Sequence, residues 1–191
     1  MFFTGTFILT FGGKSTALGG LTLAYSTGES TSSQLTGAGL AVMLALLVTV
    51  PVSGGHLNPC ITFSWAVSGR FKWGKVPKYL LGQYIGAGLG ALAVLLVYFE
   101  TVDKLGATVI ASYPNPFHQH MAVKYEVLDY CNLIFDQFLA STFLLLAFSS
   151  IVLEKHNPGP LLMGLSVTGI ILALGQNAGC AMNPALDLMS R

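Results

Sequence analysis

One pattern occurs twice in this chain, first as Gly55-His56-Leu57-Asn58-Pro59-Cys60 and again as Gly179-Cys180-Ala181-Met182-Asn183-Pro184-Ala185. Asn is a favoured N-cap and Pro is preorganised for the first helical position, so each Asn-Pro pair predicts the start of a helix. The apolar segment behind Asn58 ends at Ser68-Gly69. About ten helical residues rise only ~15 Å, half of a ~30 Å hydrocarbon core. The pattern therefore predicts half-helices rather than full membrane spans.

The composition around these segments is typical of a membrane protein. Hydrophobic residues make up 53% of the 191 and charged residues only 9%, whereas soluble domains carry about 25% charged residues. Lipid accepts apolar surface on every side, which a soluble core of this length could not bury. A net charge of +1 implies no nucleic acid and no acidic partner. The three cysteines have spacings that fit neither a disulfide framework nor a metal site, so we expect no metal and no cofactor.

Five segments are long and apolar enough for membrane-spanning helices, which need about 20 residues. They are residues 2–25, 35–52, 77–99, 129–152 and 160–176. The apolar start of the chain has no basic stretch before it, so we expect no cleavable signal peptide and a chain that begins inside its first span. The sequence thus predicts an all-α, multi-pass integral membrane protein.

Four of the nine basic residues lie in the connection of residues 68–78, at Arg70, Lys72, Lys75 and Lys78. The positive-inside rule places such a connection in the cytoplasm. Residues 26–34 and 100–128 suit the other side, because they are poor in bases or balanced by acids, and residues 154–157 return to the cytoplasm. Solvated surface bases are the alternative interpretation, but all four connections agree with one topology. The expected location is the plasma membrane, with residues 68–78 in the cytoplasm.

The two Asn-Pro patterns divide the chain into two similar units. The first unit covers residues 1–99, a linker covers 100–128, and a second, incomplete unit covers 129–191. A unit of two spans, an Asn-Pro segment and one more span has an odd number of crossings, so the second unit is inverted relative to the first. The half-helices then enter from opposite faces and meet start to start at the midplane. Each start carries roughly half a positive charge, which opposes cations while offering donors to a neutral oxygen.

At that meeting point the side-chain amides of Asn58 and Asn183 are expected to face a solute. The chains that lead into the half-helices are glycine-rich, and unpaired backbone is tolerated at membrane depth only where it lines water or protein. We therefore expect a wet pathway lined by the carbonyls of these lead-in chains. The half-helices start at Pro59, Cys60, Pro184 and Ala185, and the lining backbone is that of Gly54, Gly55, His56, Asn177, Ala178 and Gly179.

These residues resemble the aquaporin family, whose two pore loops each carry Asn-Pro-Ala, and the similarity extends over nearly the whole chain. Its glycerol-permeable branch, the aquaglyceroporins, is the closer likeness. Asp187 supports that branch, because an acid two positions past the second Asn-Pro-Ala is typical of glycerol channels rather than of strict water channels. The motifs that carry the resemblance are residues 53–59, Gly69-Arg70, Trp73, Lys75, Pro77, Phe135-Asp136-Gln137-Phe138 and residues 179–185.

The resemblance implies an inverted-repeat helix bundle with two re-entrant half-helices, assembled in the lipid bilayer as a homotetramer with one pore per subunit. It also implies a passive channel for glycerol, water and urea. An intramembrane enzyme is a rival class, but it would need converging acid, base or nucleophile groups. The spans offer only Lys14, Asp136 and isolated thiols and hydroxyls, so we expect no enzyme.

The sequence departs from the family pattern at its outer filter. The first motif ends in Cys60 instead of Ala, a small-for-small exchange that a packed half-helix tolerates. Leu186 stands where the family has an arginine after the second Asn-Pro-Ala. Counting back from the asparagines places the other filter positions at Ala38, Ile171 and Cys180. We expect either a wider, more apolar filter with relaxed solute choice or a filter that no longer works, and ion exclusion that rests on the half-helix dipoles.

Three polar residues near the pathway have competing interpretations. Lys14 would cost about 2.5 kcal/mol or more at the bilayer centre, so we expect its stem to extend toward the interface. Asp136 is expected to accept hydrogen bonds from the adjacent loop or half-helix rather than to touch solute. His56 either lines the cytoplasmic half of the pathway or hydrogen-bonds a neighbouring helix.

The sequence stops at Arg191, within the second half-helix and before any sixth span. Because a pore without one wall would not seal, we expect a partial chain, an incomplete gene model or a degenerate relative. The alternative function is a truncated, non-conducting subunit that binds intact homologues and modulates their assembly. Leu186 favours this alternative as well.

Overall fold

All secondary structure in the described part of the chain is helical. The computed structural model describes residues 3–27, 33–105, 130–153 and 158–190. Its elements are α1 (Thr4–Thr27), α2 (Ser33–Ser53), α3 (Pro59–Val67), the 3-10 turn η1 (Trp73–Lys75), α4 (Val76–Val97), α5 (Phe99–Leu105), α7 (Tyr130–Leu153), α8 (Gly159–Ala178) and α9 (Pro184–Met189). Each of the five expected spans forms one long helix, with ends within two residues of the prediction.

Two short helices follow the Asn-Pro pairs, as the sequence predicted. α3 has 9 residues and α9 has 6. The linker expected at residues 100–128 begins in α5, and the remainder of that linker lies outside the described residues. Residues 154–157, expected to form a cytoplasmic connection, also lie outside them.

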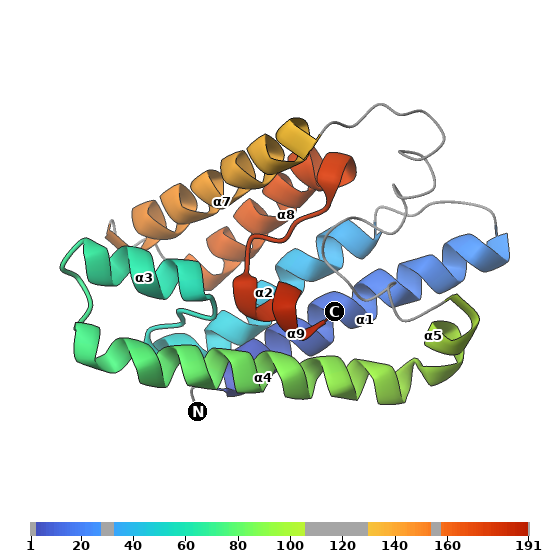
Figure 1. The fold of residues 1–191 in the computed structure, drawn as a ribbon, viewed down its shortest axis with the longest axis horizontal. Helices are drawn as coiled ribbons and strands as arrows, with labels where there is room; N and C mark the ends of the chain where they lie inside the picture. The colour runs from blue at the N-terminus through green and yellow to red at the C-terminus, as the bar shows by residue number, and fades with distance from the viewer. Residues whose placement is uncertain (1–2, 28–32, 106–129, 154–157, 191) are drawn as a thin grey trace.

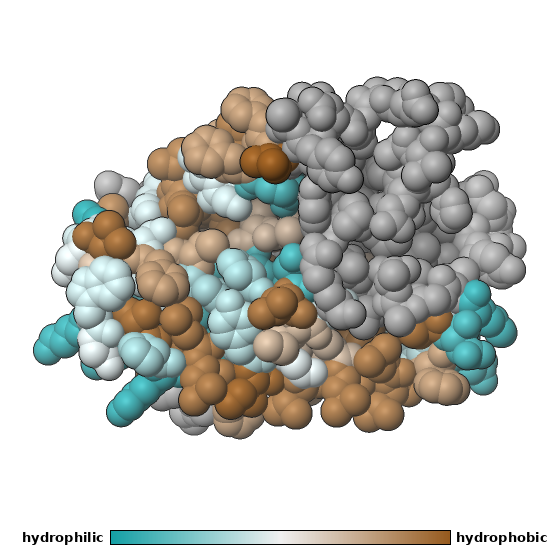
Figure 2. All heavy atoms as spheres, viewed as in Figure 1, coloured by the Kyte–Doolittle hydropathy of each residue, from teal (hydrophilic) through white to brown (hydrophobic). Residues whose placement is uncertain are grey.

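Three helices within the described residues are long and apolar enough to cross a membrane. Their segments are Thr36–Ser53, Trp73–Val97 and Ile134–Leu153, and Gly159–Gly175 of α8 is a shorter apolar helix. α1 is the least apolar of the long helices, because glycines, threonines and a lysine interrupt its aliphatic residues. Figure 2 shows hydrophobic residues along the lower edge of the view, over α4, and hydrophilic residues gathered toward both ends. This distribution suits helices that expose their sides to lipid and their ends to water.

The long helices form a bundle around the two short ones. α1 contacts α2 and α4, α2 contacts α8, and α8 contacts α7. α3 packs against α4 and α7, α9 packs against α4, and the two short helices touch each other. Figure 1 shows α3 and α9 roughly in line, between the α7–α8 pair and α4, with their starts facing the middle of the bundle. The starts of the two short helices therefore meet inside the molecule.

The crossing of α2 and α8 depends on two glycines. A Cβ atom on Gly164 would lie 2.8 Å from the carbonyl oxygen of Gly39 and 2.9 Å from Cβ of Met43. A Cβ atom on Gly39 would in turn overlap the Gly164 carbonyl and the Thr168 hydroxyl. Small residues at helix contacts in membranes let backbones approach closely, and here they bring together the two central helices of the bundle.

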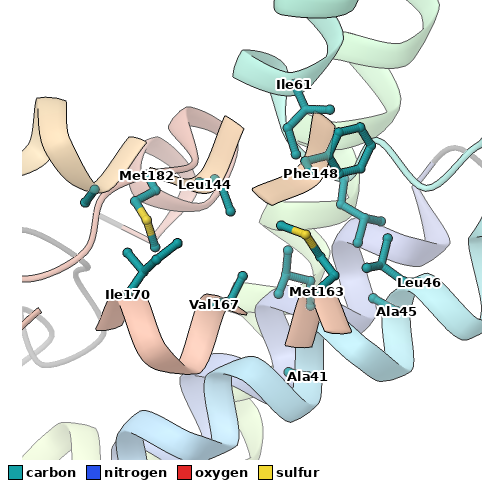
Figure 3. Close-up of a cluster of buried hydrophobic side chains, with 13 residues drawn as sticks. Ala41, Ala45, Leu46, Ile61, Leu144, Phe148, Met163, Val167, Ile170 and Met182 are labelled. Carbon is teal, nitrogen blue, oxygen red and sulfur yellow. The ribbon is translucent and has the colours of Figure 1, made fainter. Parts of the chain in front are cut away.

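The main hydrophobic core lies beside this crossing and reaches the second lead-in chain. It joins buried residues of α1, α2, α3, α7 and α8 to Met182, which precedes α9. In Figure 3, Ile170 of α8 points toward Met182, and Met163 lies near Phe148 of α7. The start of α9 is thus anchored on the same core that holds the long helices together.

Lys14 does not have the environment expected from the sequence. Only 8% of its surface is exposed, so the expectation that its stem extends to the interface was wrong. The residue lies one turn from Thr10 and Leu18 on α1, both of which pack near α4. By its spacing, Lys14 shares the face of α1 that packs toward α4.

Candidate functional site

Each Asn-Pro pair starts a helix by side-chain capping. Asn58 has an extended backbone, and its Oδ1 accepts a hydrogen bond of 2.9 Å from the N–H of Cys60. Asn183 does the same for α9, accepting from Ala185 at 3.1 Å and from Leu186 at 3.5 Å. Pro59 and Pro184 occupy the first helical positions, where a missing N–H has no consequence. Both helix starts are therefore fixed by the local sequence.

The other end of each asparagine amide reaches across to the opposite lead-in chain. Nδ2 of Asn58 donates to the carbonyl of Met182 at 2.9 Å, and Nδ2 of Asn183 donates to the carbonyl of Leu57 at 2.9 Å. Both side chains are buried, with 3% of Asn58 and 9% of Asn183 exposed. This reciprocal pair of hydrogen bonds joins two segments that are far apart in the sequence, and it brings the two predicted midplane residues together.

Each asparagine retains hydrogen-bonding capacity at this junction. A carboxamide NH2 group has two donor hydrogens, and each Nδ2 uses one of them on a carbonyl. Within the residues that the structure describes, neither Nδ2 atom has a second acceptor. Two N–H donors, one from each half of the chain, are therefore left at the point where the helix starts meet.

The first lead-in chain, residues 54–57, has positive φ angles at three of its four residues. Gly54 and Gly55 have φ values of +78° and +65°, which glycine adopts without steric cost. Leu57 has φ +53°, which is uncommon for a residue with a side chain. Its carbonyl is the acceptor for Asn183, and its side chain is buried in the main core. Packing and the cross-chain hydrogen bond together hold Leu57 in a conformation that its local sequence disfavours.

The second lead-in chain is shorter than the sequence suggested. Asn177 and Ala178 were expected in irregular, pathway-lining backbone, but they are the last two residues of α8. Gly179 ends the helix instead, with φ +88° and an N–H that donates to Gly175 at 3.1 Å. Glycine stops a helix because it accepts this positive φ. The irregular segment is therefore Gly179 to Met182.

Several backbone carbonyls in the lead-in chains are open to a further partner. The carbonyls of Gly54, Gly55 and His56 accept no hydrogen bond from the described part of the chain, and the same holds for Cys180 and Ala181. The carbonyl of Gly179, also expected to line the pathway, accepts from a glutamine side chain on α7. Each half of the junction thus offers acceptors beside its asparagine donor.

His56 is held by a hydrogen-bonded group centred on Thr62 of α3. The Thr62 hydroxyl donates to the carbonyl of Asn58 at 3.1 Å and accepts from Nε2 of Gln83 at 2.9 Å. Nδ1 of His56 lies 3.1 Å from the same hydroxyl oxygen. Because the Thr62 proton is already used, Nδ1 is the donor, which leaves Nε2 of the neutral ring as an acceptor. His56 therefore makes the helix contact that was one of its two expected roles.

Aromatic side chains surround this histidine. Its ring centroid is 4.6 Å from that of Phe71 and 5.0 Å from that of Tyr79, whose hydroxyl donates to the carbonyl of Ser53 at 2.9 Å. Phe71 follows the end of α3 and is brought back by its N–H, which donates to the carbonyl of Trp65. Aromatic rings of Phe71 and Tyr79 therefore pack around His56 in the first lead-in chain.

Gln137 of α7 is a site residue that the sequence did not single out. Its Nε2 donates to the carbonyl of Gly179 at 2.6 Å, and its Oε1 accepts from the N–H of Ala181 at 2.8 Å. The sequence assigned contact with the loop to the neighbouring Asp136, which is buried, with 6% exposed. Both residues belong to the Phe135-Asp136-Gln137-Phe138 motif. Asp136 also lies near the loop, because its carboxyl group interacts electrostatically with Cys180.

The positions expected to form the outer filter are partly assembled. Cys180 and Ile171 converge, because a Cβ atom on Gly175 would lie 3.0 Å from Sγ of the first and 3.1 Å from Cγ2 of the second. Leu186 of α9 is half-buried and packs against the main core, as do Ile171 and Cys180. Ala38 is half-buried on α2. Ile171 and Leu186 therefore pack against the same core as Cys180 of the second lead-in chain.

The first turn of α9 also carries Asp187. Its N–H donates to the carbonyl of Asn183 at 3.0 Å, which places the carboxylate close to the helix start. A negative side chain at this end interacts favourably with the partial positive charge of the helix. Asp187 thereby stabilises a short helix that contributes few internal hydrogen bonds of its own.

Comparisons with known proteins agree with this geometry. The sequence model of the family described as major intrinsic protein matches residues 2–191. Aquaporin-9 of Mus musculus is 33% identical over 99% of this chain and 66% of its own length, and Aquaglyceroporin-2 of Rhizophagus irregularis is 31% identical over 99% and 62%. Aquaporin-9 of Homo sapiens is 34% identical over 81% of this chain and 55% of its own length. The chain therefore spans about 55% to 66% of the length of these relatives.

A solved structure shares the fold. The X-ray structure of the aquaglyceroporin from Plasmodium falciparum superposes with a TM-score of 0.84 at 27% sequence identity. The superposition covers 100% of this chain and 77% of the other. The expected fold class, an aquaporin-like helical membrane protein, is confirmed by this match and by the helices described above.

Proposed function

Because the chain belongs to the major intrinsic protein family, a family of channels rather than enzymes, we propose that it is a passive channel for glycerol, water and similar small neutral solutes. The observation that carries this proposal is the reciprocal pair of hydrogen bonds between Asn58 and Met182 and between Asn183 and Leu57. It supports a junction where one donor from each half-helix start faces a solute oxygen. The proposed host is the plasma membrane.

The proposed selection against ions follows from the same junction. Two helix starts point at one place, so their partial positive charges add and oppose a cation. The asparagines contribute neutral donors, which bind a hydroxyl or water oxygen without requiring it to carry charge. A solute that is neutral and accepts hydrogen bonds therefore pays no electrostatic penalty there.

The lead-in chains suit a polyol as well as water. Open carbonyls at Gly54, Gly55 and His56 on one side, and at Cys180 and Ala181 on the other, accept hydrogen bonds from hydroxyl groups. The side chains of Leu57, Met182 and Ile171 lie in or against the main core beside them. We propose that acceptors and apolar side chains on opposite walls match the hydroxyl and carbon faces of glycerol.

We propose that Ala38, Ile171, Cys180 and Leu186 form an apolar outer filter. Leu186 supplies no charge at the place where the family has an arginine, and Ile171 and Cys180 lie close together near Gly175. Such a filter supports relaxed choice among small neutral solutes, including urea.

The wider assembly is proposed from the resemblance. A homotetramer with one pore in each subunit, with residues 68–78 in the cytoplasm, fits the four exposed bases of that connection and the apolar sides of α2 and α4. The inverted relation between residues 1–99 and 129–191 fits the two half-helices, which run in opposite directions from one junction. No enzymatic step is part of the proposal.

Swelling of proteoliposomes tests the function. The 191-residue chain is reconstituted, and the rate of swelling in an inward glycerol gradient is measured by stopped-flow light scattering. A faster rate than in protein-free vesicles is expected, with no swelling in a sucrose gradient as the control for leakiness. A rate equal to that of protein-free vesicles, at wild-type helix content by circular dichroism, would contradict passive conduction by this chain.

A further inference from the structure

We propose that the connection between α3 and α4, with the end of α3 before it, is a docking surface for the headgroups of anionic phospholipids. Four exposed bases and two exposed apolar side chains form this surface, which we call the basic surface: Arg70, Lys72, Lys75, Lys78, Val67 and Trp73. The inference concerns the surface of the molecule rather than the junction of the half-helices, so it does not depend on conduction.

The bases of this surface have no acidic neighbours in the sequence. Between Glu29 and Glu100 the chain contains no Asp and no Glu. All four bases are exposed, and none of them forms an ion pair with a carboxylate of the described residues. Positive charges gathered on one short connection repel one another and attract an anion. A partner that brings several negative charges therefore stabilises this surface.

The basic surface continues an exposed apolar stripe on α4. Apolar side chains recur there at spacings of three and four residues, which places them on one face of the helix: Leu81, Ile85, Leu89, Leu92 and Leu96. Lys78 precedes Leu81 by three residues, so it lies on the same face, ~4.5 Å closer to the start of the helix. Figure 2 shows hydrophobic residues along α4 and hydrophilic residues that project from the end where α4 begins. The bases therefore lie where the hydrocarbon of a bilayer gives way to its headgroups.

Two apolar side chains favour a lipid over a soluble acidic partner. Val67 is 75% exposed and Trp73 is 56% exposed. The Trp73 ring packs against that of Phe63, with the ring centroids 6.3 Å apart. Tryptophan is enriched at membrane–water interfaces, because its ring is apolar and its N–H is polar. A lipid offers phosphate to the bases and acyl chain to Val67 and Trp73, whereas a free phosphate would leave both apolar side chains in water.

The backbone of the basic surface is folded by its own hydrogen bonds. The carbonyl of Trp65 accepts from the N–H groups of Arg70 and Phe71, at 2.9 Å and 3.0 Å. The N–H of Lys75 donates to the carbonyl of Lys72 at 2.9 Å. The bases are thus carried by an ordered connection, which reduces the entropy lost when a headgroup binds.

Trp73 itself can report which lipid lies beside it. The chain is reconstituted in phosphatidylcholine bilayers in which a fixed fraction of the lipid carries bromine on its acyl chains near the headgroup. This brominated lipid is either phosphatidylcholine or phosphatidylglycerol, and bromine quenches tryptophan fluorescence only at short range. Trp73→Phe keeps an aromatic ring against Phe63 and gives the signal of Trp65, which is subtracted. The two quenching curves yield the binding constant of phosphatidylglycerol relative to phosphatidylcholine at Trp73.

Wild type is expected to prefer phosphatidylglycerol at least about tenfold at low ionic strength. The preference should fall as KCl is raised from about 0.05 M to about 0.5 M, because salt screens exposed charges. Replacement of all four bases by glutamine is expected to abolish it. Lys104→Gln is the matched control, because Lys104 is an exposed base on α5, next to the exposed Asp103, and its removal should leave the preference unchanged.

Equal quenching by the two lipids in wild type, or an unchanged preference in the chain without the four bases, overturns the proposal. If that chain does not fold, Lys72→Gln and Lys75→Gln are measured singly, and a preference equal to that of Lys104→Gln in both overturns it. The measurement involves no solute flux. A chain that keeps the preference but does not swell vesicles would contradict the channel proposal alone.

Competition distinguishes the sources of negative charge. Inorganic phosphate and poly-glutamate are added separately, each at an ionic strength matched with KCl. Neither is expected to lower the preference for phosphatidylglycerol more than KCl does. Stronger displacement by inorganic phosphate would indicate a site for free phosphate, and stronger displacement by poly-glutamate a surface for an acidic protein. Either result overturns the assignment to a lipid.

Discussion

Asn58 and Asn183 each use one amide for two tasks. The oxygen caps the helix that follows, and the nitrogen donates to the opposite lead-in chain. An aspartate would retain the cap but lose the donor, and a serine would be too short to span the junction. The identity of these residues thus follows from the distance between two backbones as well as from helix capping.

Thr62 is the residue on which the first lead-in chain most depends. Thr62→Val removes a hydroxyl that contacts Asn58, Gln83 and His56, and leaves buried donors without an acceptor. We expect a loss of about 1–3 kcal/mol in the free energy of unfolding, measured as a lower Tm in detergent by circular dichroism. Thr62→Ser keeps the hydroxyl and is the control. Equal Tm values for the two variants would show that this group does not stabilise the fold.

Leu186 is the residue that tests the filter assignment. Leu186→Arg places a fixed cation beside the second lead-in chain, where a unit charge ~4 Å from a passing cation costs it about 4 kcal/mol at an effective dielectric constant of 20. We expect slower glycerol and urea permeation relative to water, and at least about tenfold less cation leak. Leu186→Met serves as the neutral control. Unchanged selectivity and leak in Leu186→Arg would remove Leu186 from the filter.

At the scale of elements, the hydropathy pattern was sufficient to locate the long helices, because a bilayer requires about 20 consecutive apolar residues. It did not locate the end of α8, where Gly179 rather than Asn177 stops the helix through its positive φ. It also did not predict the hydrogen bonds of Gln137 to the lead-in chain, because only tertiary packing decides which helical side chains reach that backbone. The burial of Lys14 likewise depends on how α1 packs in the bundle, which the sequence of α1 does not contain.

The contact of α2 with α8 gives a prediction for whole elements. Gly164→Ala introduces a methyl group 2.8 Å from the Gly39 carbonyl, and overpacking of this kind costs about 1–3 kcal/mol. We expect a lower Tm in detergent and reduced conduction, because the helices that support the second lead-in chain move apart.

Gly169→Ala is the matched control on the same helix. No atom lies within 4 Å of the place where its Cβ would stand, and alanine is the better helix former by about 1 kcal/mol. Its Tm is expected to equal or exceed that of wild type. If Gly164→Ala were as stable as Gly169→Ala, close approach of α2 and α8 would not be required.

At the scale of the whole molecule, the two ends of α4 should face opposite sides of the membrane. Gly74 lies in the basic connection before α4, and Asp103 lies on α5 beyond its other end; both are exposed. On a chain whose native cysteines are replaced by alanine, an impermeant maleimide applied outside intact cells is expected to label Asp103→Cys but not Gly74→Cys. Permeabilised cells should label both. Labelling of Gly74→Cys from outside would invert the topology.

The most direct test of the account concerns the junction of the two half-helices. Asn58→Asp and Asn183→Asp keep the helix caps but replace the cross-chain donor by a carboxylate oxygen that opposes the Met182 or Leu57 carbonyl. Glycerol and water permeability of reconstituted vesicles is expected to fall at least about tenfold in each variant, at wild-type helix content. Conduction at the wild-type rate in both variants would contradict a solute pathway through this junction.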